Sequence, residues 1–199
     1  MFSKKILTLI SFLIIFSLNF EKVYSIEADI FVQSTVNRAA KTLGGNLTKE
    51  ERIDKLKIIA KETVDIQGIG LYSLGAYRKI ITDEQQKKYD KLFSKYFLIT
   101  FSSRLAEYSN PKIEVNSKKI INKNYTIVNS TLVTTSTRPE VKIDWRVYTK
   151  DPENLMIRDL IIEGLSLVRT QKEEFASIIN SNDGDINALL ENLTKFNNQ

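Results

Sequence analysis

The chain has 199 residues, and its 29 Lys and Arg side chains outnumber its 24 Asp and Glu side chains, which gives a formal net charge of +5. It contains neither cysteine nor histidine. This excludes disulfide bonds, cysteine nucleophiles, and every site that needs an imidazole as a general base or metal ligand. Any chemistry must therefore come from carboxylates or lysines, and the 42% hydrophobic content is typical of one globular domain.

The N-terminal segment is typical of a cleavable secretory signal. After two lysines, residues 6–18 hold only apolar side chains apart from one threonine and two serines. A run of this length fits the apolar region of a signal peptide and is too short to span a bilayer. Val23 and Ser25 occupy positions −3 and −1 of a small-residue cleavage site. We expect residues 1–25 to be removed and residues 26–199 to form one domain, with an uncleaved membrane anchor as the alternative.

Helical patterns dominate the first half of the mature chain. Apolar residues recur at spacings of three and four, and the glycine pair at 44–45 is a stop signal after the first segment. Thr48 with Glu51, and Thr82 with Gln85, have the spacing of a capping box, which marks the start of a helix. We predict helices over residues 28–43, 48–64, 71–81 and 83–108, with an interruption at 65–70.

The predicted helix over residues 83–108 has a strongly aromatic face. Its rings recur at helical spacing, at Tyr89, Phe93, Tyr96, Phe97, Phe101 and Tyr108. This surface is larger than one neighbouring helix needs to cover. Core packing and a cavity for an apolar ligand both remain open for these rings.

Strand patterns replace helical ones in the second half. Residues 141–148 alternate strictly, with Val141, Ile143 and Trp145 among the apolar residues on one face, as in a half-buried antiparallel strand. Helices followed by an antiparallel meander and further helices give an α+β class with a four-stranded antiparallel sheet. We predict strands over 113–121, 125–135, 141–148 and 155–163, and helices over 165–180 and 185–196.

Enzyme motifs are incomplete in this chain. Gly70 and Gly75 have the glycine spacing of a phosphate loop, but Ala76-Tyr77 stands where a Lys-Ser/Thr pair must hold the nucleotide and magnesium. Ser166 lies in a partial nucleophile elbow, and no histidine is present to activate it.

One carboxylate pair keeps an enzyme open as an alternative. Asp159 and Glu163 are four residues apart on a predicted strand, so they share a face and could support acid–base chemistry or a metal. Exposure beside Arg158 and Arg169 is the interpretation we favour. A hydrolase that uses Asp159 and Glu163 remains the competing hypothesis.

Several blocks of the sequence are distinctive in combination. They are Asp65-Ile66-Gln67-Gly68-Ile69, Leu74-Gly75-Ala76-Tyr77-Arg78-Lys79-Ile80-Ile81-Thr82-Asp83-Glu84-Gln85-Gln86, the rings Tyr89, Phe93, Tyr96 and Tyr108, residues 141–148 around Trp145, Ile161-Ile162-Glu163-Gly164-Leu165-Ser166-Leu167, and Phe175-Ala176-Ser177-Ile178-Ile179. With these blocks the sequence resembles the MlaC family, the periplasmic phospholipid carriers of the Mla (maintenance of lipid asymmetry) system, over about residues 30–196. The chain departs from the family at Tyr77, where a tryptophan is common, and at Gln171-Lys172, where Tyr-Arg is usual.

The resemblance implies an α+β fold whose helices and curved sheet enclose an apolar cavity for acyl chains. It implies a protein that is not an enzyme, with no metal and no cofactor other than phospholipid as bound ligand, in the periplasm of a Gram-negative bacterium. The implied partners are a membrane-anchored lipid-binding subunit of an inner-membrane ABC transporter and an outer-membrane lipoprotein–porin complex. We expect a monomer that does not bind nucleic acid, because acids and bases are mixed throughout and the mature chain has a net charge of only +3.

The resemblance and the apolar patterns together suggest which residues contact the lipid. We expect Arg78, Arg146 and Lys172 at the pocket mouth or on a docking surface for partners. An adaptor or chaperone with an ordinary solid core is a third hypothesis. The residues expected to line the cavity are Ile69, Leu74, Phe93, Phe97, Phe101, Ile127, Val133, Trp145, Val147, Ile157 and Leu165.

Overall fold

The structure is a computed structural model that describes residues 27–108, 110–136 and 139–199. The predicted signal peptide at 1–25 lies outside the described residues. The elements follow in the order α2 (Ala28–Gly44), α3 (Lys49–Thr63), α4 (Ile66–Ser73), the 3₁₀ helix η2 (Gly75–Lys79), α5 (Asp83–Ala106), β1 (Ile113–Asn122), β2 (Tyr125–Leu132), β3 (Val141–Tyr148), β4 (Met156–Ile162), β5 (Leu165–Ser166), α6 (Leu167–Asn180) and α7 (Ile186–Asn197). The α+β class is confirmed.

Local signals start two of the helices as predicted. Thr48 accepts a hydrogen bond from the backbone N–H of Glu51, whose carboxylate accepts one from the N–H of Thr48, so the capping box at α3 is complete. Thr82 and Gln85 form the same arrangement at α5.

The break before α4 is shorter than predicted. The sequence suggested an interruption over 65–70, but the helix begins at Ile66, because Asp65 Oδ1 accepts a hydrogen bond of 2.9 Å from the N–H of Gly68 and caps it. The helix ends at Ser73 instead of continuing to 81. Gly75 has a φ of +58°, a left-handed conformation that glycine adopts without strain, and η2 follows.

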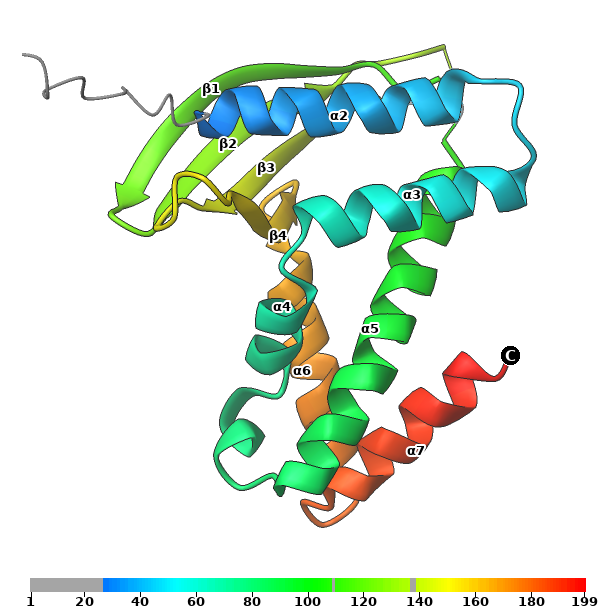
Figure 1. Ribbon diagram of the computed structural model, residues 1–199, viewed down its shortest axis with the longest axis vertical. Coiled ribbons are helices and arrows are strands. Elements are labelled where there is room, and N and C mark those ends of the chain that lie inside the picture. Colours follow the sequence, from blue (N-terminus) through cyan, green and yellow to red (C-terminus); the bar gives the residue numbers. More distant parts are fainter. Residues whose placement is uncertain (1–26, 109, 137–138) are drawn as a thin grey trace, which may run out of the picture.

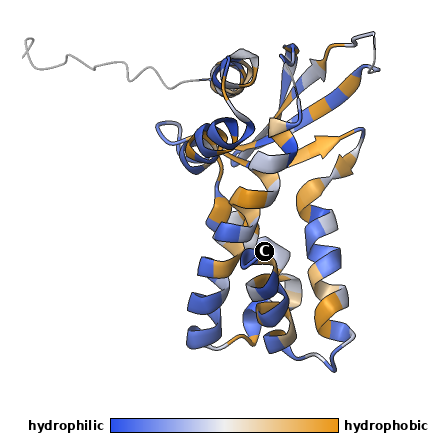
Figure 2. Cartoon of the chain, turned by 90° about the vertical axis from the view of Figure 1, so that its right-hand side faces the viewer, coloured by the Kyte–Doolittle hydropathy of each residue, from blue (hydrophilic) through white to orange (hydrophobic). Residues whose placement is uncertain are grey.

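The strands form one antiparallel meander in the order β1-β2-β3-β4-β5. Buried and less buried residues alternate along β2, and Figure 2 shows apolar and polar segments alternating along the sheet. The structure adds a two-residue strand, β5, to the four predicted. Glu163 and Gly164 both have positive φ, +49° and +83°, as the central residues of a tight type I′ hairpin turn require.

The helices form two groups, with α2 and α3 beside the sheet and α4 to α7 extending away from it (Figure 1). Helix α2 lies across β1 and β2, and α3 packs against α5. Helices α4 and α6 pack on each other and on β4, while α7 packs along α5. None of the helices in 27–108, 110–136 and 139–199 is long and apolar enough to span a membrane.

The aromatic face of α5 serves two purposes along its length. In its first half Tyr89 and Phe93 make edge contacts with Phe175 of α6, at ring-centroid distances of 6.3 and 6.1 Å, and both rings are fully buried. Further along, Phe97 and Phe101 stack on each other at 5.4 Å and are only partly buried. The first half therefore builds core, and the second half leaves ring surface free to line a cavity.

Candidate functional site

An apolar cavity of about 130 Å³ lies between the sheet and the helix layer of α2, α3 and the end of α5. Because β3 alternates, Ile143 and Trp145 face this cavity, and β4 adds Ile157 and Leu160. The other lining residues are Thr35, Val36, Ala39, Ala40, Leu43, Leu56, Ile59, Ala60, Thr63, Val64, Phe101, Leu105, Tyr108, Pro111, Ile113, Leu132, Val141 and Ile162.

The cavity wall is uncharged. None of the described residues that line it is Asp, Glu, Lys or Arg. The hydroxyls of Thr35 and Thr63 donate to carbonyl oxygens of their own helices at 2.9 and 2.8 Å. The indole N–H of Trp145 donates to Ser130 Oγ at 2.8 Å. Since these donors are already satisfied within the protein, the cavity favours hydrocarbon over any polar ligand.

The cavity borders a smaller and mostly apolar space of about 40 Å³, which we call the neck and which Asp159 also lines. The two spaces share Val64, Phe101, Trp145, Ile157 and Leu160. The neck in turn shares residues with a space of about 150 Å³ between α5 and α6, among them Ile69, Phe97 and Leu167. We call these adjoining spaces together the apolar passage. It extends from beneath the sheet to between α5 and α6, where Arg104 and Glu174 also line the third space.

Six of the eleven predicted cavity residues lie on the apolar passage. Phe101, Trp145 and Ile157 line the main cavity, and Ile69 and Phe97 line the neck. Phe93 reaches only the space between α5 and α6.

The other five do not line the apolar passage. Leu74 and Val147 are fully buried in the solid core. Ile127 lies on the opposite face of β2 from the buried Val128, where its cross-strand partner is Arg146. Val133 follows the end of β2, and Leu165 is 61% exposed beside the hairpin turn. Core and cavity residues are alike in sequence, and apolar composition alone does not say which face of β2 turns inward.

Helices α2 and α3 contribute to the cavity, which the sequence patterns did not indicate. Ala39, Ala40 and Ala60 lie where these helices face the sheet, and their small side chains leave room in the cavity. Alanines within the apolar stripe of two helices were the available signal. They could not be told from alanines that allow close helix packing, because the sequence does not reveal what lies opposite.

Residues 32–195 match the sequence family described as MlaC protein. The chain belongs to the MlaC family. Its fold also matches the phospholipid-binding protein from Ralstonia solanacearum, which was solved in complex with a phospholipid. That comparison has a TM-score of 0.73 and 23% sequence identity, and covers 87% of this chain and 98% of the other. The MlaC family is one of lipid-transport proteins and not of enzymes.

The two candidate catalytic carboxylates, Asp159 and Glu163, have structural roles in this MlaC protein. Asp159 is buried, and its two oxygens accept hydrogen bonds from the Ser166 hydroxyl at 2.6 Å and the Val168 N–H at 3.2 Å. This corrects the favoured expectation that Asp159 is exposed. Glu163 instead lies in the hairpin turn, where it accepts from the N–H of Lys142. Asp159 therefore holds the start of α6 against β4, and no group of three metal-ligating residues occurs in the described ranges.

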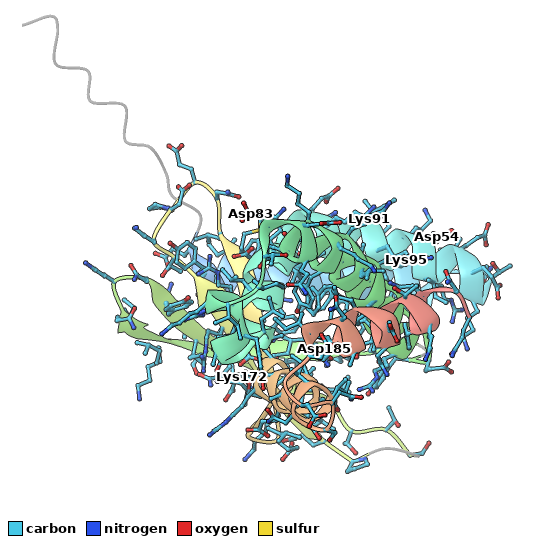
Figure 3. The ribbon with its side chains drawn as sticks, turned by 90° about the horizontal axis from the view of Figure 1, so that it is seen from below. Asp54, Asp83, Lys91, Lys95, Lys172 and Asp185 are labelled. Carbon is cyan, nitrogen blue, oxygen red and sulfur yellow. The ribbon has the colours of Figure 1, made fainter. Side chains whose placement is uncertain are left out.

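Two of the three basic residues expected at a mouth lie together. Arg78 and Arg146 line one pocket beside the neck. Lys172 of α6 does not line this pocket itself, but its Nζ lies 5.4 Å from the ring centre of Tyr72, which does. Figure 3 shows Lys172 beside the ribbons of α4 and α6.

Two pKa shifts mark groups whose ionisation is fixed by the MlaC fold. Burial raises the pKa of the Tyr89 phenol, which stays neutral and donates to the Gly70 carbonyl oxygen. Burial lowers the pKa of the Arg158 guanidinium, but hydrogen bonds with Tyr125 and Asp65 outweigh this and leave it raised. Arg158 is therefore permanently charged beside the neck.

Proposed function

We propose that this MlaC-family chain is a phospholipid carrier that holds acyl chains in the apolar passage. The observation that carries the proposal is the uncharged lining of the main cavity, in which the Thr35, Thr63 and Trp145 donors are satisfied by the protein itself. Family membership and the fold shared with a phospholipid-binding protein support it.

A carrier of this kind has a physical task that needs no catalysis. At ~0.8 kcal/mol per methylene, exposing two acyl chains to water costs on the order of 20 kcal/mol, so lipid does not cross an aqueous compartment unshielded. The apolar passage would cover the chains while the polar headgroup stays near water.

The main cavity alone is smaller than a usual ligand pocket. Its volume of about 130 Å³ is below the ~300–1,000 Å³ usual for ligand pockets. Helices α2 and α3 form one wall and the sheet forms the other, so separation of these layers enlarges the space. The neck and the space between α5 and α6 add about 40 and 150 Å³ to the room for acyl chains.

The setting of this carrier follows from the Mla system. It works in the periplasm of a Gram-negative bacterium after removal of residues 1–25, as a monomer. It exchanges lipid with a membrane-anchored lipid-binding subunit of an inner-membrane ABC transporter and with an outer-membrane lipoprotein–porin complex. The transporter, and not this chain, uses ATP.

Native mass spectrometry of the protein purified from a bacterial periplasm tests the carrier function. We expect a mass increment that matches a phospholipid, and lipid uptake from vesicles by protein that has first been stripped of lipid. A mass equal to that of the apoprotein, together with no uptake from vesicles, would overturn the proposal. The mass of the polypeptide from the same experiment shows whether residues 1–25 have been removed.

A further inference from the structure

A basic pocket of about 470 Å³ lies beside the neck of the apolar passage. Arg78 of η2, Arg146 of β3 and Arg158 of β4 come to it from three different elements. Arg146 faces it because β3 alternates, so that the buried Trp145 and Val147 point to the opposite side of the sheet.

Arg158 is held in place by its neighbours. Its Nε donates to Asp65 Oδ2 at 2.6 Å and its Nη1 donates to the Tyr125 hydroxyl at 2.9 Å. Its guanidinium carbon lies 3.8 Å from the centre of the Tyr148 ring. These contacts orient one cation at the pocket wall, which lowers the entropy cost of binding an anion there.

Arg78 and Arg146, by contrast, have no counter-ion in the part of the chain that the structure describes. Within residues 27–108, 110–136 and 139–199 neither forms a salt bridge or a hydrogen bond through its guanidinium. The carboxylate on the pocket wall, Asp159, already accepts hydrogen bonds from the Ser166 hydroxyl and the Val168 N–H. Two forked donors therefore face the pocket unpaired, and planar forks of this kind suit phosphate oxygens.

The basic pocket borders the space for hydrocarbon. Ile69, Asp159 and Val168 line both the basic pocket and the neck, and the neck in turn borders the main cavity. A ligand that enters the passage can thus place hydrocarbon among Phe97, Phe101 and Trp145 and an anionic group among the arginines.

We propose that the basic pocket of Arg78, Arg146 and Arg158 binds the phosphodiester of the lipid whose acyl chains occupy the apolar passage. This inference rests on the carrier function proposed above and adds a selection for phosphate-bearing lipids. A neutral lipid with the same chains leaves the two unpaired arginines without an anion.

The test is competition between two lipids that differ only in phosphate. Stripped protein is mixed with vesicles that contain phosphatidylglycerol and diacylglycerol with the same acyl chains in equal amounts, and bound lipid is counted by native mass spectrometry. We expect wild type to favour phosphatidylglycerol by about tenfold or more, as charge-assisted hydrogen bonds imply. In the double variant Arg78→Gln/Arg146→Gln the ratio falls toward one, and Arg146→Lys retains part of the preference.

The control is the double variant Lys79→Gln/Arg169→Gln, which removes the same charge from exposed residues that do not line the basic pocket. It should keep the wild-type ratio. Equal uptake of both lipids by wild type, or an unchanged ratio in Arg78→Gln/Arg146→Gln, overturns the phosphate site and leaves the carrier function standing. Uptake of neither lipid overturns the carrier function and this inference with it.

Calorimetric titration with inorganic phosphate separates a headgroup site from a free phosphate site. We expect no measurable binding of inorganic phosphate at millimolar concentration, because the acyl chains supply most of the affinity. Binding of inorganic phosphate that the Arg78→Gln/Arg146→Gln variant loses, without a lipid preference in wild type, would assign the pocket to free phosphate and overturn the headgroup assignment.

Discussion

The hydroxyl of Tyr89 on α5 donates a hydrogen bond of 2.9 Å to the backbone carbonyl oxygen of Gly70 on α4, and both residues are buried. At this point α4 approaches α5 closely, because a Cβ added at Gly70 would lie only 2.7 Å from Cδ1 of Phe93. The preceding residue, Ile69, lines both the neck and the basic pocket. The contact of Tyr89 with Gly70 therefore positions one wall of the candidate site.

Gly70→Ala should destabilise the fold. The added methyl group meets the Phe93 ring inside a packed core, which lowers the free energy of unfolding by about 1–3 kcal/mol. The better helix propensity of alanine offsets about 0.5–1 kcal/mol of this loss. Urea denaturation followed by circular dichroism measures the difference. Gly45→Ala is the control, since its φ is −82° and the nearest atom to an added Cβ is 3.6 Å away. Equal loss of stability in both variants would show that α4 and α5 are not closely packed at Gly70.

Stability should fall at alkaline pH, in part through Tyr89. Burial raises the pKa of this phenol above the usual value of 10.0, and the charge of Asp90 adds to the effect. The unfolded chain loses the phenol proton near pH ~10, while the folded chain keeps it. The contribution of Tyr89 to the free energy of unfolding is therefore complete below that pH and decreases above it. Urea denaturation at about pH 8 and about pH 11 should show a smaller decrease for Tyr89→Phe than for wild type. An identical decrease would contradict the buried neutral phenol.

Asp159→Ala should lower stability far more than Glu163→Gln. Loss of the Asp159 carboxylate leaves the Ser166 hydroxyl and the Val168 N–H without their partner near the core, at a cost of about 1–3 kcal/mol. Glu163 is exposed, and its replacement should change stability by less than about 0.5 kcal/mol. Thermal unfolding of both variants makes the comparison. A larger effect from Glu163→Gln would contradict the roles assigned to these two carboxylates.

Ala40→Phe should block the main cavity. A cavity of about 150 Å³ is large enough to hold one benzene ring, so the introduced ring fills most of the space beside α2. We expect lipid occupancy in native mass spectra to fall well below half of the wild-type value, with the circular dichroism spectrum retained. Ala188→Phe on α7 is the control, because Ala188 is also partly buried and does not line the apolar passage. Unchanged lipid occupancy in Ala40→Phe would show that the acyl chains do not lie in this cavity.

Features with local causes were predictable from sequence. The capping boxes at Thr48 and Thr82 need only groups three residues apart, and both form as expected. The alternation over 141–148 gave the bounds of β3, because the period of a strand is visible wherever one face is buried. The turn at Glu163 and Gly164 was missed, since it depends on pairing between β4 and the short β5.

Placement of the candidate site was only partly predictable. Trp145 and Ile157 were chosen as apolar strand residues and do face the cavity, whereas Ile127 has the same character and faces away. The difference lies in which side of the sheet α2 covers, and that is a contact between residues far apart in the chain. Arg78 of η2 and Arg146 of β3 line the same pocket for a similar reason, since only folding brings residues so far apart in the chain to one place.

By itself, the sequence determined the α+β class, most element boundaries, membership of the MlaC family, and the lack of thiols and imidazoles, because each follows from composition or from patterns along the chain. The tertiary structure alone decided that Ala39, Ala40 and Ala60 help to enclose the cavity, that Asp159 is buried as a cap for α6, and that three arginines share one pocket. A cavity is a space between elements, and a charge cluster joins side chains from several elements. Both are therefore defined only when helices and strands pack.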